Sequence, residues 1–135
     1  MPKPFIFLPH MADIKIRVTA ASMPKLFEGV TKAFASYVAG EQKLKSKTKK
    51  VIELSGSDTQ SLMYAYLDEL LYLLDAENFV TLSASVKVKG YTLKATLKGA
   101  DSTKYHLNHI KAATYAEMRI EKEKKGWVAD VVLDV

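Results

Sequence analysis

The stretch LMYAYLDELLYLL, residues 62–74, carries apolar side chains around most of a helical circumference. A helix that is apolar on nearly every side is buried against other elements. A capping-box pattern over residues 57–60 predicts where this helix begins. Asp68 and Glu69 project about 100° apart from it, so we expect them to be exposed to solvent rather than to act as a carboxylate pair. We therefore predict that this helix forms the core of the domain.

Strands and a second helix are predicted on both sides of this core helix. Ser22 can cap a helix that has Pro24 in its first turn and ends at Gly40. Alternation of apolar and polar residues predicts strands, two of them joined as a hairpin by Lys89 and Gly90. These strands lie near residues 14–18, 51–54, 80–88, 91–97, 115–121 and 127–135. The order predicts a two-layer α+β fold, with a mixed β-sheet of about six strands and two main helices.

Length and composition restrict the class of protein. The chain has 135 residues, of which 48% are apolar and 26% charged, so we expect a single folded domain over residues 1–135. It has no cysteine, which excludes disulfides, thiolate metal sites and a cysteine nucleophile. No apolar run approaches the roughly 20 residues that span a bilayer, so we expect no membrane contact. Without an evident export signal, a cytoplasmic location is expected.

A net charge of +5 suggests a polyanionic partner, but the placement of the lysines limits this reading. Five of them fall within residues 43–50. This run has no arginine to form bidentate hydrogen bonds with bases and no aromatic residue to stack on them. The run is typical of a hydrated connector. The alternative is a weak, salt-sensitive contact with a polyanion, so direct RNA binding is expected to be weak at most.

No complete catalytic constellation is present. The chain lacks glycine-rich phosphate-binding motifs and the nucleophile-elbow pattern. His10, His106 and His109 do not have metal-ligand spacing. Asp13 instead begins the polar face of its predicted strand. Asp134 directly precedes Val135, whose C-terminal carboxylate provides further oxygens. If the two strands are neighbours, these oxygens converge and require a raised pKa or a hard cation such as calcium.

Four segments together resemble the archease family, and they span nearly the whole chain in the family's order. They are HMADIKI (residues 10–16), DELLYLLD (68–75), IKAATY (110–115) and GWVADVVLDV (126–135). The resemblance implies a protein cofactor, not itself an enzyme, that activates an RtcB-type tRNA-splicing RNA ligase by promoting its guanylylation and turnover. It also implies a metal site, usually described as calcium, formed by Asp13, Asp134 and Val135.

The resemblance further implies that Lys111 and His10 take part in partner binding or activation; Lys111 could otherwise simply cap a loop. Met11 stands where the family usually has threonine, which removes a hydroxyl that could orient Asp13 or its water. Ala116 replaces a histidine found in many members, so partner contacts there could differ. An alternative function is that of a chaperone or modulator of a tRNA-modifying enzyme such as a methyltransferase, which would need a binding surface but no metal.

Overall fold

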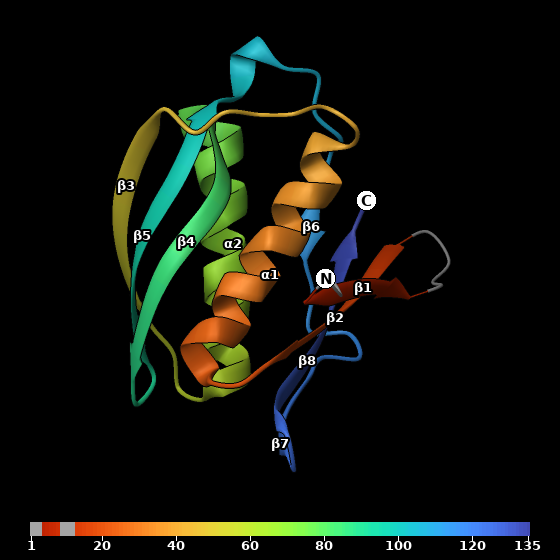
Figure 1. Cartoon of the computed structure of the whole chain (residues 1–135), viewed down its shortest axis with the longest axis vertical. Helices are drawn as coiled ribbons and strands as arrows, with labels where there is room; N and C mark the ends of the chain where they lie inside the picture. The colour runs from red at the N-terminus through yellow and green to blue at the C-terminus, as the bar shows by residue number, and fades with distance from the viewer. Residues whose placement is uncertain (1–3, 9–12) are drawn as a thin grey trace.

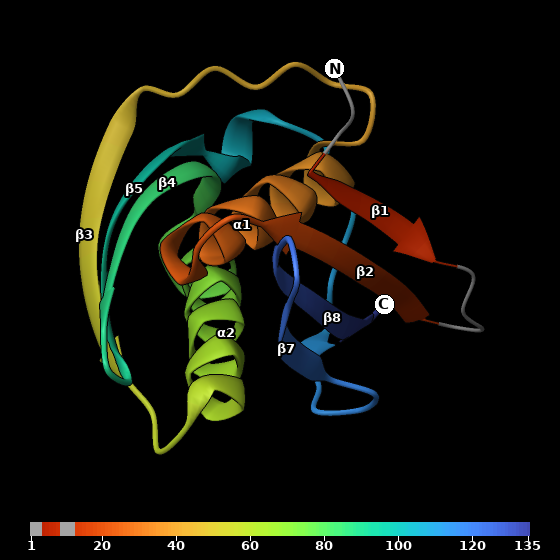
Figure 2. The same ribbon diagram turned by 60° about the horizontal axis from the view of Figure 1, so that its bottom comes forward.

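The computed structural model describes residues 4–8 and 13–135. Its two α-helices lie between two β-sheets (Figures 1 and 2). The helices are α1 (Met23–Ala39) and α2 (Thr59–Glu77), and a short 3-10 helix spans Ser102–Lys104. The larger sheet contains β1 (Phe5–Leu8), β2 (Asp13–Ala20), β6 (Ala112–Ala113), β7 (Arg119–Glu123) and β8 (Gly126–Asp134). The smaller sheet contains β3 (Thr48–Ser55), β4 (Phe79–Lys89) and β5 (Thr92–Asp101).

Strand β8 is the centre of the larger sheet. The order of that sheet is β1-β2-β8-β6. Strand β7 pairs with the first five residues of β8, Gly126–Asp130. The smaller sheet has the order β3-β5-β4. Every pairing among the described strands is antiparallel. The last strand of the chain is therefore held between β2 on one side and both β6 and β7 on the other.

The α+β class with two main helices is confirmed, but the strands form two antiparallel sheets rather than one mixed sheet of about six strands in two layers. The physical reason lies in α2. Because this helix is apolar around most of its circumference, it contacts β3 and β4 on one side and β6 and β7 on the other. A helix buried on two sides can cover a sheet on each.

Helix boundaries follow from local capping. The Ser22 side chain accepts a hydrogen bond from the Lys25 amide, and Gly40 ends α1 with a positive φ of 62°, as the sequence predicts. The capping box of α2 was predicted one residue too early. Asp58 is the N-cap and Ser61 completes the reciprocal pair, because the aspartate carboxylate is in reach of the N3 amide.

Three strands differ from the prediction, and one of them is the two-residue strand β6, which was not predicted. The edge strand β1 was not predicted, because its four residues carry no clear alternation. Strand β7 begins at Arg119 instead of residue 115, since Glu117 has a φ of 52° and turns the chain. The predicted hairpin is confirmed as β4 and β5, and Gly90 has the positive φ that its turn requires.

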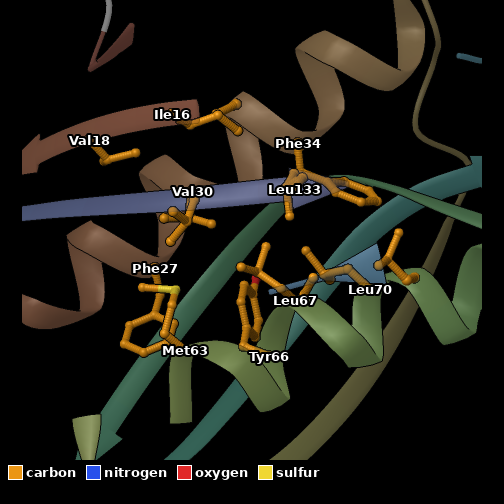
Figure 3. Packing of buried hydrophobic residues seen from close by; sticks show 14 of the residues in the cluster. Ile16, Val18, Phe27, Val30, Phe34, Met63, Tyr66, Leu67, Leu70 and Leu133 are labelled. Carbon is orange, nitrogen blue, oxygen red and sulfur yellow. The ribbon is translucent and has the colours of Figure 1, made fainter. Parts of the chain in front are cut away.

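One continuous apolar core joins the helices to both sheets. Phe27, Val30 and Phe34 of α1 point into the space between the larger sheet and α2 (Figure 3). Tyr66 of α2 is fully buried, and its hydroxyl is hydrogen-bonded to Thr31 of α1. Among the described residues, no helix combines the length and the apolar character needed to cross a membrane. The core thus anchors β2 and β8, the two strands that carry the predicted acidic residues.

Candidate functional site: an acidic pair at the end of the central strand

Asp13 and Asp134 are directly opposed across the β2–β8 ladder. Their neighbours Ile14 and Leu133 pack into the core, so both aspartates project from the outer face of the larger sheet, away from the helices. Directly opposed antiparallel residues have Cβ atoms about 4.5–5.5 Å apart. The predicted condition for convergence, that these two strands are neighbours, is therefore met.

Lys111 lies on the other side of Asp134. Its backbone amide donates a 2.8 Å hydrogen bond to the Asp134 carbonyl, and the next residue, Ala112, pairs with Asp134 in the β6–β8 ladder. The Lys111 side chain is exposed. The end of β8 thus brings together Asp13, Asp134 and Lys111, which are far apart in the sequence. His10 and Met11 lie outside the described residues.

The donor atoms of this acidic pair fit a hard cation. Both aspartate side chains supply carboxylate oxygens, which Ca²⁺ prefers, and Val135 follows directly after Asp134. Within residues 4–8 and 13–135, no group of three His, Cys, Asp or Glu side chains comes together. Within these residues, further donors to a cation at the acidic pair would be oxygens of other kinds, such as a terminal carboxylate, a backbone carbonyl, water or a partner's group.

Asp130 is a buried charged residue that the sequence did not single out. It lies on the same face of β8 as Asp134 and is only 3% exposed. Arg17 of β2 donates to it from Nε at 2.7 Å and from Nη2 at 3.1 Å, and Arg119 of β7 donates from Nε at 3.2 Å. In register, Asp130 stands between these two arginines. The only signal in the sequence was a charge among the valines of a predicted central strand.

The two arginines stabilise the ionised form of Asp130. The Arg17 hydrogen bond is the main cause that holds the pKa of Asp130 below its ordinary value, against the opposing effect of burial, and Arg119 adds to the lowering. The same contacts raise the pKa of both arginines. Because the three side chains come from three adjacent strands, this ion cluster holds β2, β8 and β7 in the register that places Asp13 opposite Asp134.

The segment after Lys111 is held against β8 and α2. The Thr114 hydroxyl donates a 3.0 Å hydrogen bond to the Val132 carbonyl. Tyr115, 52% exposed, stacks on Tyr64 of α2 with ring centroids 4.4 Å apart and planes 7° apart. These contacts give the IKAATY segment a structural role, and they leave the Lys111 side chain available to a partner.

The remaining acidic residues of α2 do not belong to this site. Asp68 is exposed, as predicted, whereas Glu69 is half-buried and burial raises its pKa. Glu77, close to the end of the helix, forms a 2.7 Å ion pair with Lys50.

Comparison with known proteins decides the family. Residues 5–135 match the model of the Archease protein family (MTH1598/TM1083). The chain belongs to the archease family. Proteins named archease from Pyrococcus abyssi and Pyrococcus furiosus are 37% and 35% identical to it over 134 residues, which cover 93% of this chain and 94% of each relative. An archease from Methanosarcina mazei is 31% identical and covers 98% of this chain and 97% of the relative.

Solved structures agree with this archease assignment. The solution structure of Methanobacterium thermoautotrophicum protein 1598 superimposes with a TM-score of 0.80 at 26% identity, covering 99% of this chain and 100% of that one. A Thermotoga maritima crystal structure, described as an archease and possible chaperone, has a TM-score of 0.70 at 21% identity and covers 100% of this chain and 98% of that one. The second likeness concerns the fold alone.

Proposed function

We propose that this archease is a non-enzymatic protein cofactor that activates an RtcB-type tRNA-splicing RNA ligase by promoting its guanylylation and turnover. One structural observation carries the proposal. Asp13 and Asp134 are opposed in register at one end of the sheet, with Lys111 bonded to the Asp134 backbone. The proximity of these three residues, which the family resemblance also implies, supports the proposal.

The acidic pair would hold a divalent cation, with calcium as the first candidate. Ca²⁺ takes roughly six to eight oxygen ligands, so Asp13, Asp134 and the carboxylate of Val135 would leave positions for water or for a partner's oxygens. A cation bound there would supply positive charge close to phosphate groups. The incomplete set of protein donors suits a site that is completed in a complex.

Activation would consist of positioning. Phosphoryl and nucleotidyl transfer depend mainly on alignment and on neutralised charge, so a rigid acidic edge that braces the ligase site could accelerate the reaction without a catalytic group of its own. The ion cluster around Asp130 keeps that edge rigid. The exposed Lys111 side chain, together with His10 before Asp13, would contact the ligase.

Single-turnover guanylylation of the cognate ligase tests this proposal. The rate is measured at limiting GTP and metal, alone and with wild-type, Asp13→Asn or Asp134→Asn protein. Asp68→Asn, which removes an exposed carboxylate from α2, is the matched control. We expect acceleration by wild type and by the control, and its loss in both site variants. Equal acceleration by folded site variants would contradict the role of the acidic pair.

A second candidate function is that of a chaperone or modulator of a tRNA-modifying enzyme such as a methyltransferase. The Thermotoga maritima relative is described as a possible chaperone. Ile6 and Phe7 on the edge strand β1 are 52% and 44% exposed, which provides apolar surface for a protein partner. Methyltransferase binding that is indifferent to a chelator and to Asp13→Asn would favour this candidate over ligase activation.

A further inference from the structure

The outer face of the β3-β5-β4 sheet carries polar side chains at every position of its aligned rows except Val51. Its inner residues, such as Leu93, Ala95 and Leu97, are buried against the helices, so the alternate residues face away from them. The register aligns these outward residues in four cross-strand rows. The rows are Lys49–Lys98–Ser83, Val51–Thr96–Ser85, Glu53–Lys94–Lys87 and Ser55–Thr92–Lys89. We call the surface formed by these four rows the lysine face.

The lysine face carries a strong excess of positive charge. It has five lysines, all exposed, and Glu53 is the one acidic residue in its rows. Lys49 lies directly opposite Lys98, and Lys94 lies between Lys87 on one side and Glu53 on the other, so only the first pair has no acidic residue in its row. Like charges directly opposed in a sheet are destabilising. Within the described parts of the chain, none of the five lysines forms an ion pair. An external polyanion would remove this repulsion.

The side chains of the lysine face indicate which polyanion fits. Lysine binds phosphate as a point charge, whereas arginine forks and aromatic rings, which read or stack bases, are absent from its rows. The surface therefore suits a sugar–phosphate backbone and not a base sequence. Hydroxyls of Ser83, Ser85 and Thr96 lie between the lysines and can hydrogen-bond a ribose 2′-OH, the group that distinguishes RNA from DNA.

We propose that the lysine face is a sequence-independent binding surface for the RNA backbone. The lysine run of residues 43–50 extends this surface. Lys43, Lys45 and Lys47 are exposed, and the Lys47 amide donates a 2.8 Å hydrogen bond to the Gly99 carbonyl, next to Lys98. The tertiary structure thus joins two groups of lysines that are separate in the sequence.

The lysine face lies on the opposite side of the helix layer from the sheet that carries Asp13 and Asp134 (Figure 2). RNA bound there would leave the acidic pair accessible to a protein partner. The inference therefore goes beyond the proposed ligase activation, and each can fail without the other. Guanylylation requires no RNA, so loss of the lysine face should leave that rate unchanged.

Binding of a fluorescently labelled RNA hairpin, followed by anisotropy from about 50 to about 200 mM salt, tests the inference. The test variant is Lys87→Gln/Lys94→Gln/Lys98→Gln. The matched control, Lys122→Gln/Lys124→Gln/Lys125→Gln, removes three exposed lysines from the β7–β8 hairpin, so the net charge changes equally. A DNA hairpin of the same sequence tests the role of the 2′-OH.

We expect the test variant to bind RNA on the order of tenfold more weakly than wild type at low salt, with a salt slope smaller by about two to three. The control variant should bind like wild type, and an RNA hairpin of different sequence should bind equally well. Equal weakening of RNA binding in both variants would show that binding depends only on the net charge of the protein. That result would overturn the assignment of RNA binding to the lysine face. Equal affinity for the DNA hairpin would overturn the assignment to RNA.

Discussion

Arg17 and Asp130 form a forked hydrogen-bonded ion pair across the two strands that also carry Asp13 and Asp134. The Arg17 Nε and Nη2 atoms lie 2.7 and 3.1 Å from the two carboxylate oxygens. The pair is four residues from the acidic pair on both strands. Arg119 completes the cluster from β7. Because Asp130 is buried and both of its partners lie opposite it, a shift in the pairing register of β8 relative to β2 and β7 would leave its charge unpaired. The ion cluster therefore fixes this register.

Replacing Asp130 by asparagine should destabilise the fold. The variant keeps the shape of the side chain but removes the charge that Arg17 and Arg119 contact. Because both arginines are about one third exposed, water recovers part of the loss, and we expect a cost of about 2 kcal/mol. Urea denaturation at pH 7 measures the free energy of unfolding. A change below about 0.5 kcal/mol, typical of surface substitutions, would contradict this role.

The same contacts predict a dependence of stability on pH. The pKa of Asp130 is lower in the folded state than in the unfolded chain, where it is about 3.9. Its contribution is therefore fully present above about pH 4 and is lost as the pH falls through the folded value. Urea denaturation between pH 7 and pH 2 should show wild type and Asp130→Asn converging at low pH. A difference that stays constant with pH would contradict this assignment.

Calcium should stabilise the wild-type protein through the acidic pair. A ligand that binds only the folded state adds about 2.7 kcal/mol at a concentration of 100 times Kd. Thermal denaturation with and without CaCl₂ should show a rise in Tm for wild type and for the Asp68→Asn control. Asp13→Asn should lose this rise. A calcium response retained by Asp13→Asn would exclude this residue from the site.

Extending the chain beyond Val135 should weaken calcium binding if its carboxylate is a ligand. A short glycine-serine extension at this end removes that carboxylate, whereas the same extension before Met1 does not. Isothermal titration calorimetry compares the two proteins. We expect about tenfold weaker binding with the extension after Val135. Equal affinities would remove Val135 from the ligand set while leaving Asp13 and Asp134 in it.

Gly29 allows helix α1 to lie close to β2. A Cβ atom at this position would be 2.5 Å from Cγ1 of Val18, a buried side chain with a restricted χ1 angle. Alanine normally stabilises a helix by about 1 kcal/mol relative to glycine. Overpacking costs about 1–3 kcal/mol, so we expect Gly29→Ala to be destabilising overall. Chemical denaturation of Gly29→Ala, Val18→Ala and the double variant measures the coupling. Strictly additive effects would contradict the close approach.

Local patterns in the sequence determined most of the elements. Ser22 and Gly40 bound α1, and alternation identified the β4–β5 hairpin, because capping and period-2 alternation act over a few residues. The apolar stretch over residues 62–74 also identified the central helix. Alternation along residues 127–135 placed Asp130 and Asp134 on one face of their strand, as the structure confirms.

Only the tertiary structure decided which other elements and residues the faces of these helices and strands contact. The division into two sheets, the burial of Asp130 between Arg17 and Arg119, and the lysine face all depend on which strands pair and in which register. Residues 13 and 134 become neighbours through a pairing that spans nearly the whole chain. Such long-range contacts arise from the burial of a common core, which local sequence does not encode.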